Sequence, residues 1–505
     1  MTAVAGPSPG RVDSIIGDAA RMAAQTAGHT ATSTQAVRNP LEAYGHWLAT
    51  VADDWPEEAV DIAYRQFIDT MAAMIPGAVA PVTLKIREQL RAWGPGDVTV
   101  VGSASGLTLP WAAMVNATAA HALDFDDNFD PAKAHISCVM WPAILAVAED
   151  LGSSGRECMD AYLAAIQIVG RIGQGVNPPH RKRGWHATGT IGTLGTACAV
   201  SRLLKLDAEQ TAMAISLATS VAGGFMSQFG TMAKPLHAGN AARNGIQSAY
   251  FAKLGVTAGL HTLDGPTGMN TLMVGPDREE LRAAIREPEH GQTLTFETEN
   301  IGEPLLIVEH RFRVKRFPTC GSAHRSLDAM EDLLAEHAFT AEEIERVDVH
   351  APAMHLKNLM YERPTTGLEG KFSIEYPLSC LLIAGSCSLG DFTQEALQRS
   401  EYRQMMERVH RHPIDRPETE VNTTIRVTLK DGRVLEKSVF MPRGSKAAPY
   451  PTSQYWDKFD QCSTLVMSAP ARKRLRTAME DFLNLERAAT LSKAFGVDMQ
   501  PVGHA

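Results

Sequence analysis

Histidine, aspartate and lysine side chains gather in short segments of this chain that otherwise consist of small or apolar residues. The first segment, H-A-L-D-F-D-D-N over residues 121–128, is followed by His135. Three carboxylates within four residues are costly to place together unless something neutralises or uses them. Asp126 and Asp127 could cap the next helix or bind a divalent cation, although the spacing is not that of a calcium loop. Asp124 stands between two apolar residues, and we interpret it as a buried functional carboxylate.

A second segment, R-K-R-G-W-H-A-T-G over residues 181–189, places a basic patch and an aromatic ring just before His186. A single histidine in such a place is more often structural than catalytic. The neighbouring glycines, however, allow the backbone to approach a ligand closely. The residues alone leave both interpretations open.

A third segment contains Lys234, Pro235 and His237. Pro235 suits the first turn of a helix, so Lys234 is expected at the start of that helix. Lys234, His237 and the positive end of the helix dipole could together bind a carboxylate. The alternative is a lysine whose ammonium group reaches solvent.

Two later segments also combine polar and small residues. They are F-P-T-C-G-S-A-H over residues 317–324 and G-L-E-G-K-F-S over residues 367–373, and they carry Cys320, His324 and Lys371. A nucleophilic cysteine–histidine pair is conceivable here. A buried structural thiol is the favoured interpretation of Cys320, because nothing in the sequence indicates that it is ionised.

The composition limits the class of protein that must position these residues. The chain has 505 residues, a net charge of 48 − 57 = −9 and 44% hydrophobic residues. These values exclude a mainly disordered or fibrous chain, and the mild acidity gives no sign of binding to nucleic acid or to an anionic membrane. No apolar run approaches the ~18–20 residues that span a bilayer, and we expect no secretory signal because the first twenty residues lack an apolar core.

The seven cysteines are scattered and form no C-x-x-C pair. This pattern is typical of free thiols in a reducing cytoplasm, so we expect a cytoplasmic protein. It also argues against an iron–sulfur cluster, which needs several closely spaced thiolates.

The composition and the hydrophobic periodicity of the sequence predict four parts. Residues 1–38 are rich in small residues without a clear period, and we expect a poorly ordered arm or an extension that crosses a dimer. Residues 39–274 have helical character, and 275–447 alternate apolar and polar residues in several places, as in an α+β unit. Helical spacing returns over residues 448–505. We therefore predict a mainly α fold, with a large all-helical domain and a smaller inserted α+β lid.

Two local patterns support this division. Gly189, Gly192 and Gly195 lack the spacing of a dinucleotide-binding loop and predict close packing of helices instead. In the later part, alternating apolar residues over 425–429 followed by Asp-Gly at 431–432 predict a β-hairpin.

Taken together and in order, the chemical segments resemble the MmgE/PrpD family. The matching stretches are H-A-L-D-F-D-D, G-W-H-A-T-G, K-P-L-H-A-G-N-A-A and G-L-E-G-K-F-S, with L-D-G-P-T-G at 263–268. The family includes 2-methylcitrate dehydratases, cis-aconitate decarboxylases and iminodisuccinate epimerases. The resemblance covers about residues 40–490 and implies a helical main domain, a smaller α+β lid, a homodimer, and neither an organic cofactor nor a metal.

The resemblance also implies roles for individual residues. Asp124, His135, His186 and Lys234 match the catalytic positions of the family. Asn128 stands where many members have threonine, and isoleucine replaces the usual proline after His135. These two departures leave the fold expectation intact but affect the expected reaction. We assign substrate binding to the remaining polar candidates, which are Asn128, His237, His324 and Lys371.

The chemistry shared by such a site is the loss of a proton or CO₂ from carbon next to a carboxylate. The pocket must supply fixed positive charge where negative charge develops, and an acid or base that titrates near neutrality. We therefore predict a cofactor-independent lyase, in the first place a hydro-lyase, acting on a small di- or tricarboxylate. The alternatives are a cis-aconitate-type decarboxylase, an epimerase of an iminodisuccinate-like acid, and a non-catalytic polycarboxylate-binding protein.

Overall fold

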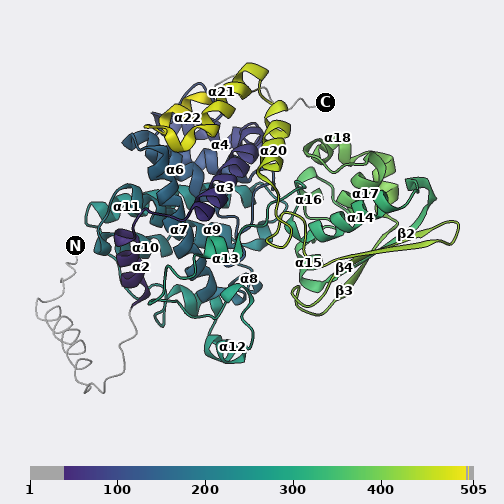
Figure 1. The fold of residues 1–505 in the computed structure, drawn as a ribbon, viewed down its shortest axis with the longest axis horizontal. Coiled ribbons are helices and arrows are strands. Elements are labelled where there is room, and N and C mark those ends of the chain that lie inside the picture. Colours follow the sequence, from purple (N-terminus) through teal and green to yellow (C-terminus); the bar gives the residue numbers. More distant parts are fainter. Residues whose placement is uncertain (1–38, 496–498, 500–505) are drawn as a thin grey trace, which may run out of the picture. The chain divides into compact units, whose positions relative to one another are not determined.

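Helices rich in alanine and methionine build the larger part of the chain (Figure 1). The computed structural model describes residues 39–495 and 499. The helices of this part pack around one hydrophobic core, and the tail of the chain returns to it. They are α2 (Pro40–Thr50), α3 (Glu57–Gly77), α4 (Pro81–Trp93), α5 (Leu109–His121), α6 (Ser137–Leu151), α7 (Gly155–Val176), α8 (Pro179–Lys182), α9 (Ala187–Leu203), α10 (Ala208–Thr219), α11 (Ala233–Lys253), α12 (Arg278–Ala284), α13 (Leu306–His310), α20 (Thr452–Thr464), α21 (Ala469–Glu480) and α22 (Ala489–Ala494), with the short strand β1 (Pro95–Val98).

Helix α9 lies at the centre of this core, where small residues let its neighbours approach. A Cβ atom at Gly195 would lie 2.4 Å from Val169 Cγ2, and one at Gly189 would lie 2.3 Å from the carbonyl oxygen of Gly223. Both distances are far below van der Waals contact, so only glycine fits. The prediction of helix packing is confirmed for Gly195, whose neighbour Val169 belongs to α7, whereas Gly189 contacts the loop residue Gly223.

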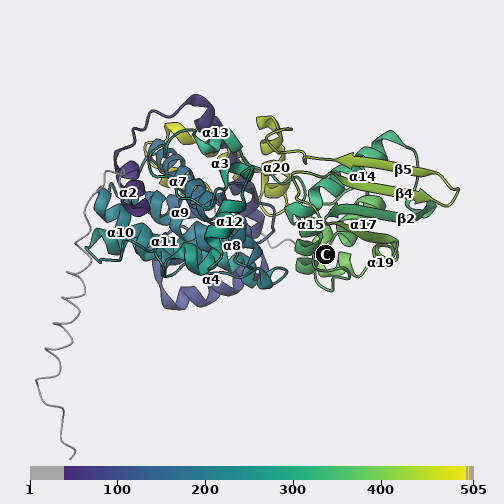
Figure 2. The same cartoon turned by 90° about the horizontal axis from the view of Figure 1, so that it is seen from below.

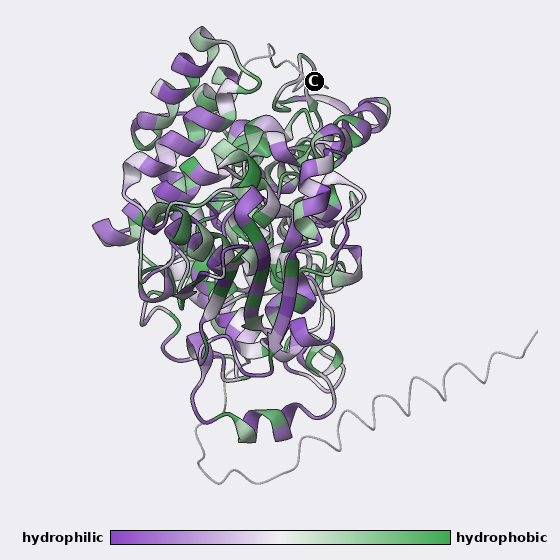
Figure 3. Cartoon of the chain, turned by 90° about the vertical axis from the view of Figure 1, so that its right-hand side faces the viewer, coloured by the Kyte–Doolittle hydropathy of each residue, from purple (hydrophilic) through white to green (hydrophobic). Residues whose placement is uncertain are grey.

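A four-stranded sheet forms the second part of the fold. The strand order is β3-β2-β4-β5, with β2 and β3 parallel and the other pairs antiparallel. Helices α14 and α17 cover the sheet in Figure 2, and Figure 3 has the strands facing the viewer. The elements are β2 (Ile344–Pro352), β3 (Val409–Ile414), β4 (Thr423–Leu429), β5 (Val434–Val439), α14 (His324–Glu336), α15 (Ala353–Asn358), α16 (Gly367–Gly370), α17 (Glu375–Ala384), α18 (Gln394–Leu397) and α19 (Ser400–Met406).

Strand β4 shows why this sheet forms. Ile425, Val427 and Leu429 are fully buried, whereas Arg426 between them is exposed. This alternation is that of a sheet with one face on a core and one toward solvent. The chain turns through Gly432, whose φ of 88° suits glycine, and the predicted hairpin is confirmed.

The two parts have separate hydrophobic cores. The second core begins at Phe317. The sequence places the start of the α+β part at residue 275, but the apolar residues between 294 and 314 are buried in the helical core. Helix α13 contacts α3 and α7, which explains this difference. The mainly α class is confirmed, and the predicted arm over residues 1–38 lies outside the described residues.

Spanning a membrane would require a long apolar helix among the described residues. None of them alone has both the length and the apolar composition that crossing a bilayer needs. Helices α3 and α4 meet these requirements only as a pair bent by 78°.

Candidate active site

Two small polar hollows lie where loops of the helical part meet the start of the α+β part. The first hollow has a volume of about 30 Å³ and the second about 80 Å³. The residues that line both are Asn128, His135, Arg181 and Cys320. The first hollow is also lined by Asp124, Lys133, Trp185, His186, Ala187, Thr188, Met226, Phe229, Lys234 and Phe372.

The Asp124 carboxylate in the first hollow is contacted by two lysine ammonium groups. Its Oδ1 accepts hydrogen bonds from Lys234 Nζ at 2.6 Å and from Lys315 Nζ at 2.8 Å, and all three side chains are buried. Burial alone would raise the pKa of Asp124, but the two ammonium groups outweigh it and hold the pKa well below its usual range. The Oδ2 atom is buried and has no hydrogen-bond partner among the described residues, so one carboxylate oxygen remains unpaired.

The backbone of Asp124 adopts a conformation that non-glycine residues rarely take. Its φ of 51° lies in the left-handed region, which costs a residue with a Cβ atom about 1 kcal/mol or more. In this conformation the carbonyl oxygen of Asp124 also accepts a hydrogen bond from Lys315 Nζ at 2.9 Å. Lys315 therefore holds the backbone and the side chain of Asp124 together.

A buried chain of hydrogen bonds extends this charge pair into the helical core. Lys234 Nζ donates to His121 Nε2 at 3.0 Å. His121 Nδ1 in turn donates to Asp126 Oδ2 at 2.7 Å, because an ionised carboxylate only accepts. The tautomer of His121 is thus fixed by Asp126, and the imidazole orients the ammonium group of Lys234 toward Asp124.

His135 presents one free nitrogen to both hollows. Its Nδ1 donates to the backbone carbonyl of Asp127, and its backbone N–H donates to Thr188 Oγ1 at 3.1 Å. The Nε2 atom therefore carries the lone pair. Burial and the nearby Lys315 hold the pKa of His135 well below 6.5, so the free protein presents a neutral imidazole.

His186 forms a second imidazole site on the opposite segment. Its Nδ1 lies 3.0 Å from Nδ1 of His237, and its Nε2 is buried without a hydrogen-bond partner among the described residues. Burial and Lys234 hold the pKa of His186 well below 6.5. His237 is half-buried, does not line either hollow, and contacts the site through His186.

Apolar side chains form one wall of the first hollow. The rings of Phe229 and Phe372 lie 5.5 and 5.4 Å from Lys234 Nζ, and the Phe229 ring meets that of His186 edge-on. A charge placed here is screened from water on this side, which strengthens its interaction with Lys234. The cations and the apolar wall thus face the same small space.

Asp126 and Asp127 do not cap a helix, so this interpretation of the sequence is wrong. The N-cap residue of α6 is Ile136, and no side chain caps that helix. Asp126 is instead the partner of His121, and Asp127 accepts a hydrogen bond from Ser137 Oγ. Burial and the neighbouring Asp69 raise the pKa of Asp127 well above its usual value, in contrast to the lowered pKa of Asp124.

Three buried side chains near the site bring metal-ligating atoms close to one another. Within the described part of the chain, His121, Asp126 and Cys138 have ligand atoms within 4.8 Å of one another. The His121–Asp126 hydrogen bond already uses two of them, and Cys138 Sγ donates to the His135 carbonyl at 3.3 Å. Asp126 Oδ1 is buried without a hydrogen-bond partner among the described residues, whereas Oδ2 is used by His121.

The residues assigned to substrate binding lie in different places. Asn128 lines both hollows and donates from Nδ2 to Asp130 Oδ1 at 2.8 Å. His324 lines the second hollow. Lys371 lines neither; its ammonium group donates to the carbonyls of Leu123 at 2.7 Å and Pro318 at 2.9 Å, and thereby fastens the two parts of the fold. The role of Lys371 in substrate binding stays a prediction.

Two residues of the site were not predicted. His121 belongs to the H-A-L-D segment, so its position was visible in the sequence although its role was not. Lys315 is a single lysine that reaches Asp124 across 191 residues of sequence, and no motif marks it.

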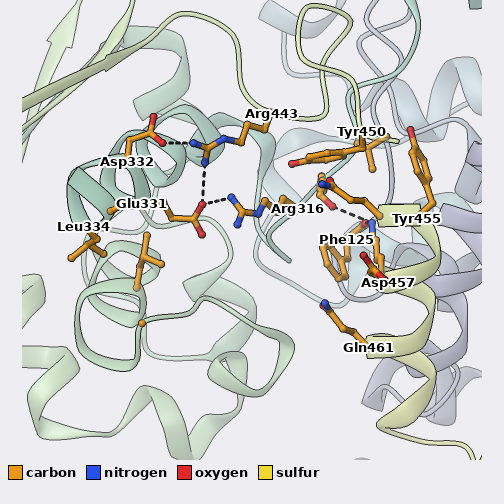
Figure 4. A pocket seen from close by; sticks show the side chains of 17 residues that line it. Phe125, Arg316, Glu331, Asp332, Leu334, Arg443, Tyr450, Tyr455, Asp457 and Gln461 are labelled. Atoms are coloured by element: carbon orange, nitrogen blue, oxygen red, sulfur yellow. Dashed lines mark hydrogen bonds and ion pairs between the residues drawn. The ribbon is translucent and has the colours of Figure 1, made fainter. Parts of the chain in front are cut away.

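A wider cleft of about 780 Å³ lies behind the loop that carries Asp124 (Figure 4). On one side, Arg316 pairs with Glu331, and Arg443 pairs with Asp332. Helix α20 forms the other side. The two arginines of the cleft, Arg316 and Arg443, are already paired with carboxylates. His135, His186 and Lys234 do not line the cleft. We therefore assign the chemistry to the two small hollows.

Comparison with known proteins identifies the family of this chain. Residues 42–282 match the model of the MmgE/PrpD N-terminal domain, and residues 317–484 match that of the MmgE/PrpD C-terminal domain. The chain belongs to the MmgE/PrpD family. The boundary between the two matches falls where the structure changes from the first hydrophobic core to the second. The prediction of an MmgE/PrpD-type lyase is confirmed.

Individual relatives in this family are named as decarboxylases. The chain is 26% identical to the cis-aconitate decarboxylase of Mus musculus over 448 residues, which cover 85% of this chain and 87% of the relative. It is 26% identical to the Homo sapiens cis-aconitate decarboxylase, covering 86% and 90% of the two chains. The identity to the Aspergillus terreus cis-aconitate decarboxylase is 27%, covering 88% and 93%.

Proposed function

We propose that this MmgE/PrpD protein decarboxylates an unsaturated tricarboxylate of the cis-aconitate type. The observation that carries the proposal is the first hollow, in which a buried lysine and two neutral imidazoles face an apolar wall. The names of the relatives favour decarboxylation over the dehydration expected first from the sequence. We further propose that the chain works as a cytoplasmic homodimer.

The electron balance of this reaction explains what the site must supply. In cis-aconitate the double bond joins the β and γ carbons, counted from the carboxylate on the CH₂ group. Breaking its C–C bond releases CO₂ and leaves the electron pair in an allylic carbanion, which a proton on the far carbon converts to a methylenesuccinate. Positive charge fixed near the carbanion lowers the barrier because it needs no reorganisation during the reaction.

The side chains divide this work between them. Lys234, held by Asp124 and His121, provides the fixed positive charge. The wall of Phe229 and Phe372 suits the neutral CO₂ that leaves. His135, with its free Nε2, is placed to carry the proton that ends on carbon.

We also propose that the α+β part acts as a lid. The first hollow has a volume of only about 30 Å³, and in this proposal the two parts move apart to admit a tricarboxylate. The chain passes between the two parts of the fold near Val314 and Arg443. These two residues line both the second hollow and the 780 Å³ cleft.

The reaction is tested by NMR in D₂O with cis-aconitate, citrate, 2-methylcitrate, malate and iminodisuccinate. We expect release of CO₂ from cis-aconitate alone, with one deuteron in the new CH₂ group of the product. A new alkene from citrate or 2-methylcitrate would indicate dehydration instead. Deuterium exchange without net conversion would indicate epimerisation, and no reaction with any acid would favour a binding protein.

Substrate binding is expected to take up protons. The free protein holds the pKa values of His135 and His186 well below 6.5, through burial and through Lys315 and Lys234 respectively. Bound carboxylates raise an imidazole pKa, so protons bind as the ligand binds and affinity falls as pH rises through the pKa of the complex. Calorimetry with a tricarboxylate in buffers of different ionisation enthalpy, between about pH 6 and 8, measures this uptake. An uptake of zero throughout would contradict the role of these imidazoles.

A further inference from the structure

Arg181 lies beside the candidate active site and pairs with no other described residue. It is half-buried in the short helix α8 and lines both hollows. Among the described residues, its guanidinium group makes no hydrogen bond and no ion pair. The other lysines and arginines that line the hollows all have carboxylate partners: Lys133, Lys234, Arg313, Lys315 and Arg443.

The second hollow offers further unsatisfied polar atoms. His324 Nε2 is buried without a hydrogen-bond partner in the described part of the chain. Only 4% of the surface of His324 is exposed. Ser322, in the turn that precedes α14, also lines this hollow, and its Oγ accepts a hydrogen bond from Asn358 Nδ2 at 3.0 Å. Burial lowers the pKa of His324 to about 3, with Lys315 adding to the effect, so the imidazole is neutral and can donate one N–H. The volume of about 80 Å³ exceeds that of the first hollow and suits a carboxylate group.

We propose that Arg181 binds a substrate carboxylate that does not react, and that it thereby selects tricarboxylates over dicarboxylates. This inference rests on the proposed function. The ammonium group of Lys234 already faces the reacting end in the first hollow. Among the described lysines and arginines that line the hollows, Arg181 supplies the one positive charge without a carboxylate partner, and His324 provides a hydrogen-bond donor in the adjoining space. A planar guanidinium group matches a carboxylate with two parallel hydrogen bonds.

The structure also supplies a matched control. Lys182 follows Arg181 in the same short helix, is exposed, and lines neither hollow. Replacing Lys182 by glutamine removes the same charge from the same helix without changing either hollow. A general electrostatic effect on anions would therefore affect both variants, whereas a direct contact would affect Arg181 alone.

The test is calorimetric binding of two unreactive acids with the same five-carbon chain, propane-1,2,3-tricarboxylate and glutarate. The Arg181→Gln variant is expected to bind the tricarboxylate about 10- to 100-fold more weakly. Its affinity for glutarate should change much less, so that the preference for three carboxylates is lost. Arg181→Lys keeps the charge without the planar fork and should recover part of the loss. Lys182→Gln should leave both affinities within about twofold of the original.

Turnover of cis-aconitate separates this inference from the proposed function. Arg181→Gln should raise KM by a similar factor and change kcat little, because the proposed contact is with a carboxylate that does not react. Binding that follows the expected pattern without any turnover would overturn the decarboxylase proposal and leave the carboxylate site standing. Equal losses for both acids, or an Arg181→Gln variant that behaves like Lys182→Gln, would overturn the assignment of Arg181.

Discussion

The Lys234→Ala variant is expected to lose about 10²- to 10³-fold in kcat and to bind its substrate more weakly. Lys234 is the ammonium group that faces the first hollow, and its Nζ is held by Asp124 Oδ1 at 2.6 Å and by His121 Nε2 at 3.0 Å. Removing a single preorganised group that stabilises developing negative charge costs about this factor. Steady-state kinetics with cis-aconitate measures both parameters.

A matched control for this variant lies on the same helix. Lys253 is in the last turn of α11 and is exposed, so Lys253→Ala removes a lysine from α11 without touching the site. Asp124 keeps Lys315 as a partner in the Lys234→Ala variant, so the fold should persist, and a thermal unfolding curve checks this. Unchanged kinetics in the folded Lys234→Ala protein would show that the ammonium group takes no part in the reaction.

The sequence predicted the parts of the site that lie in local motifs. Asp124, His135, His186 and Lys234 each stand in a short segment with a distinctive composition, and all four line the first hollow. Their assigned catalytic roles stay predictions. What no segment could indicate is the set of partners, because Lys315 is adjacent to Asp124 only through the packing of two distant parts of the chain.

The helix-capping interpretation failed for a related reason. A pair of aspartates before a helix has the same pattern in sequence whether it caps that helix or turns inward. In this fold Asp126 turns inward because His121, at the end of α5, offers a buried donor. A charged hydrogen bond in a buried site outweighs the smaller gain from a cap.

The extent of the α+β part was less predictable than its existence. Strands β4 and β5 alternate clearly, so the hairpin could be predicted from the sequence. Residues 285–305 contain little regular structure, and their composition does not say which core they cover. Leu294, Phe296 and Ile301 pack on the helical core, and only tertiary contacts determine this.

The largest effect on stability is expected from Lys458, which lies behind the site on α20. Its Nζ donates to Asp69 Oδ1 at 2.6 Å, to the carbonyl of Phe125 at 2.5 Å and to that of Lys315 at 3.2 Å. Lys458 therefore connects three segments: helix α3, the loop that follows Asp124, and the segment around Lys315 that leads into the second core. Lys458→Met keeps most of the side-chain volume but leaves Asp69, which is fully buried, without its ammonium partner.

Such a change should lower the free energy of unfolding by about 3–5 kcal/mol, because a buried charge loses its compensation. Burial raises the pKa of Asp69 even with Lys458 present, and the loss of the ammonium group raises it further. A carboxyl whose pKa is higher in the folded state adds stability at low pH that is lost as pH rises through that value. The destabilisation should therefore be smaller at pH 5 than at pH 8, which urea unfolding at the two pH values measures.

Removing the charge on Asp69 as well should restore much of this loss. The double variant Asp69→Asn/Lys458→Met has no buried charge left at this position, so its stability should exceed that of Lys458→Met and depend less on pH. Lys473→Met, at an exposed position of α21, controls for the loss of a lysine from the surface. If the double variant were no more stable than Lys458→Met, the cost would come from the two lost carbonyl contacts of Lys458 and not from the charge on Asp69.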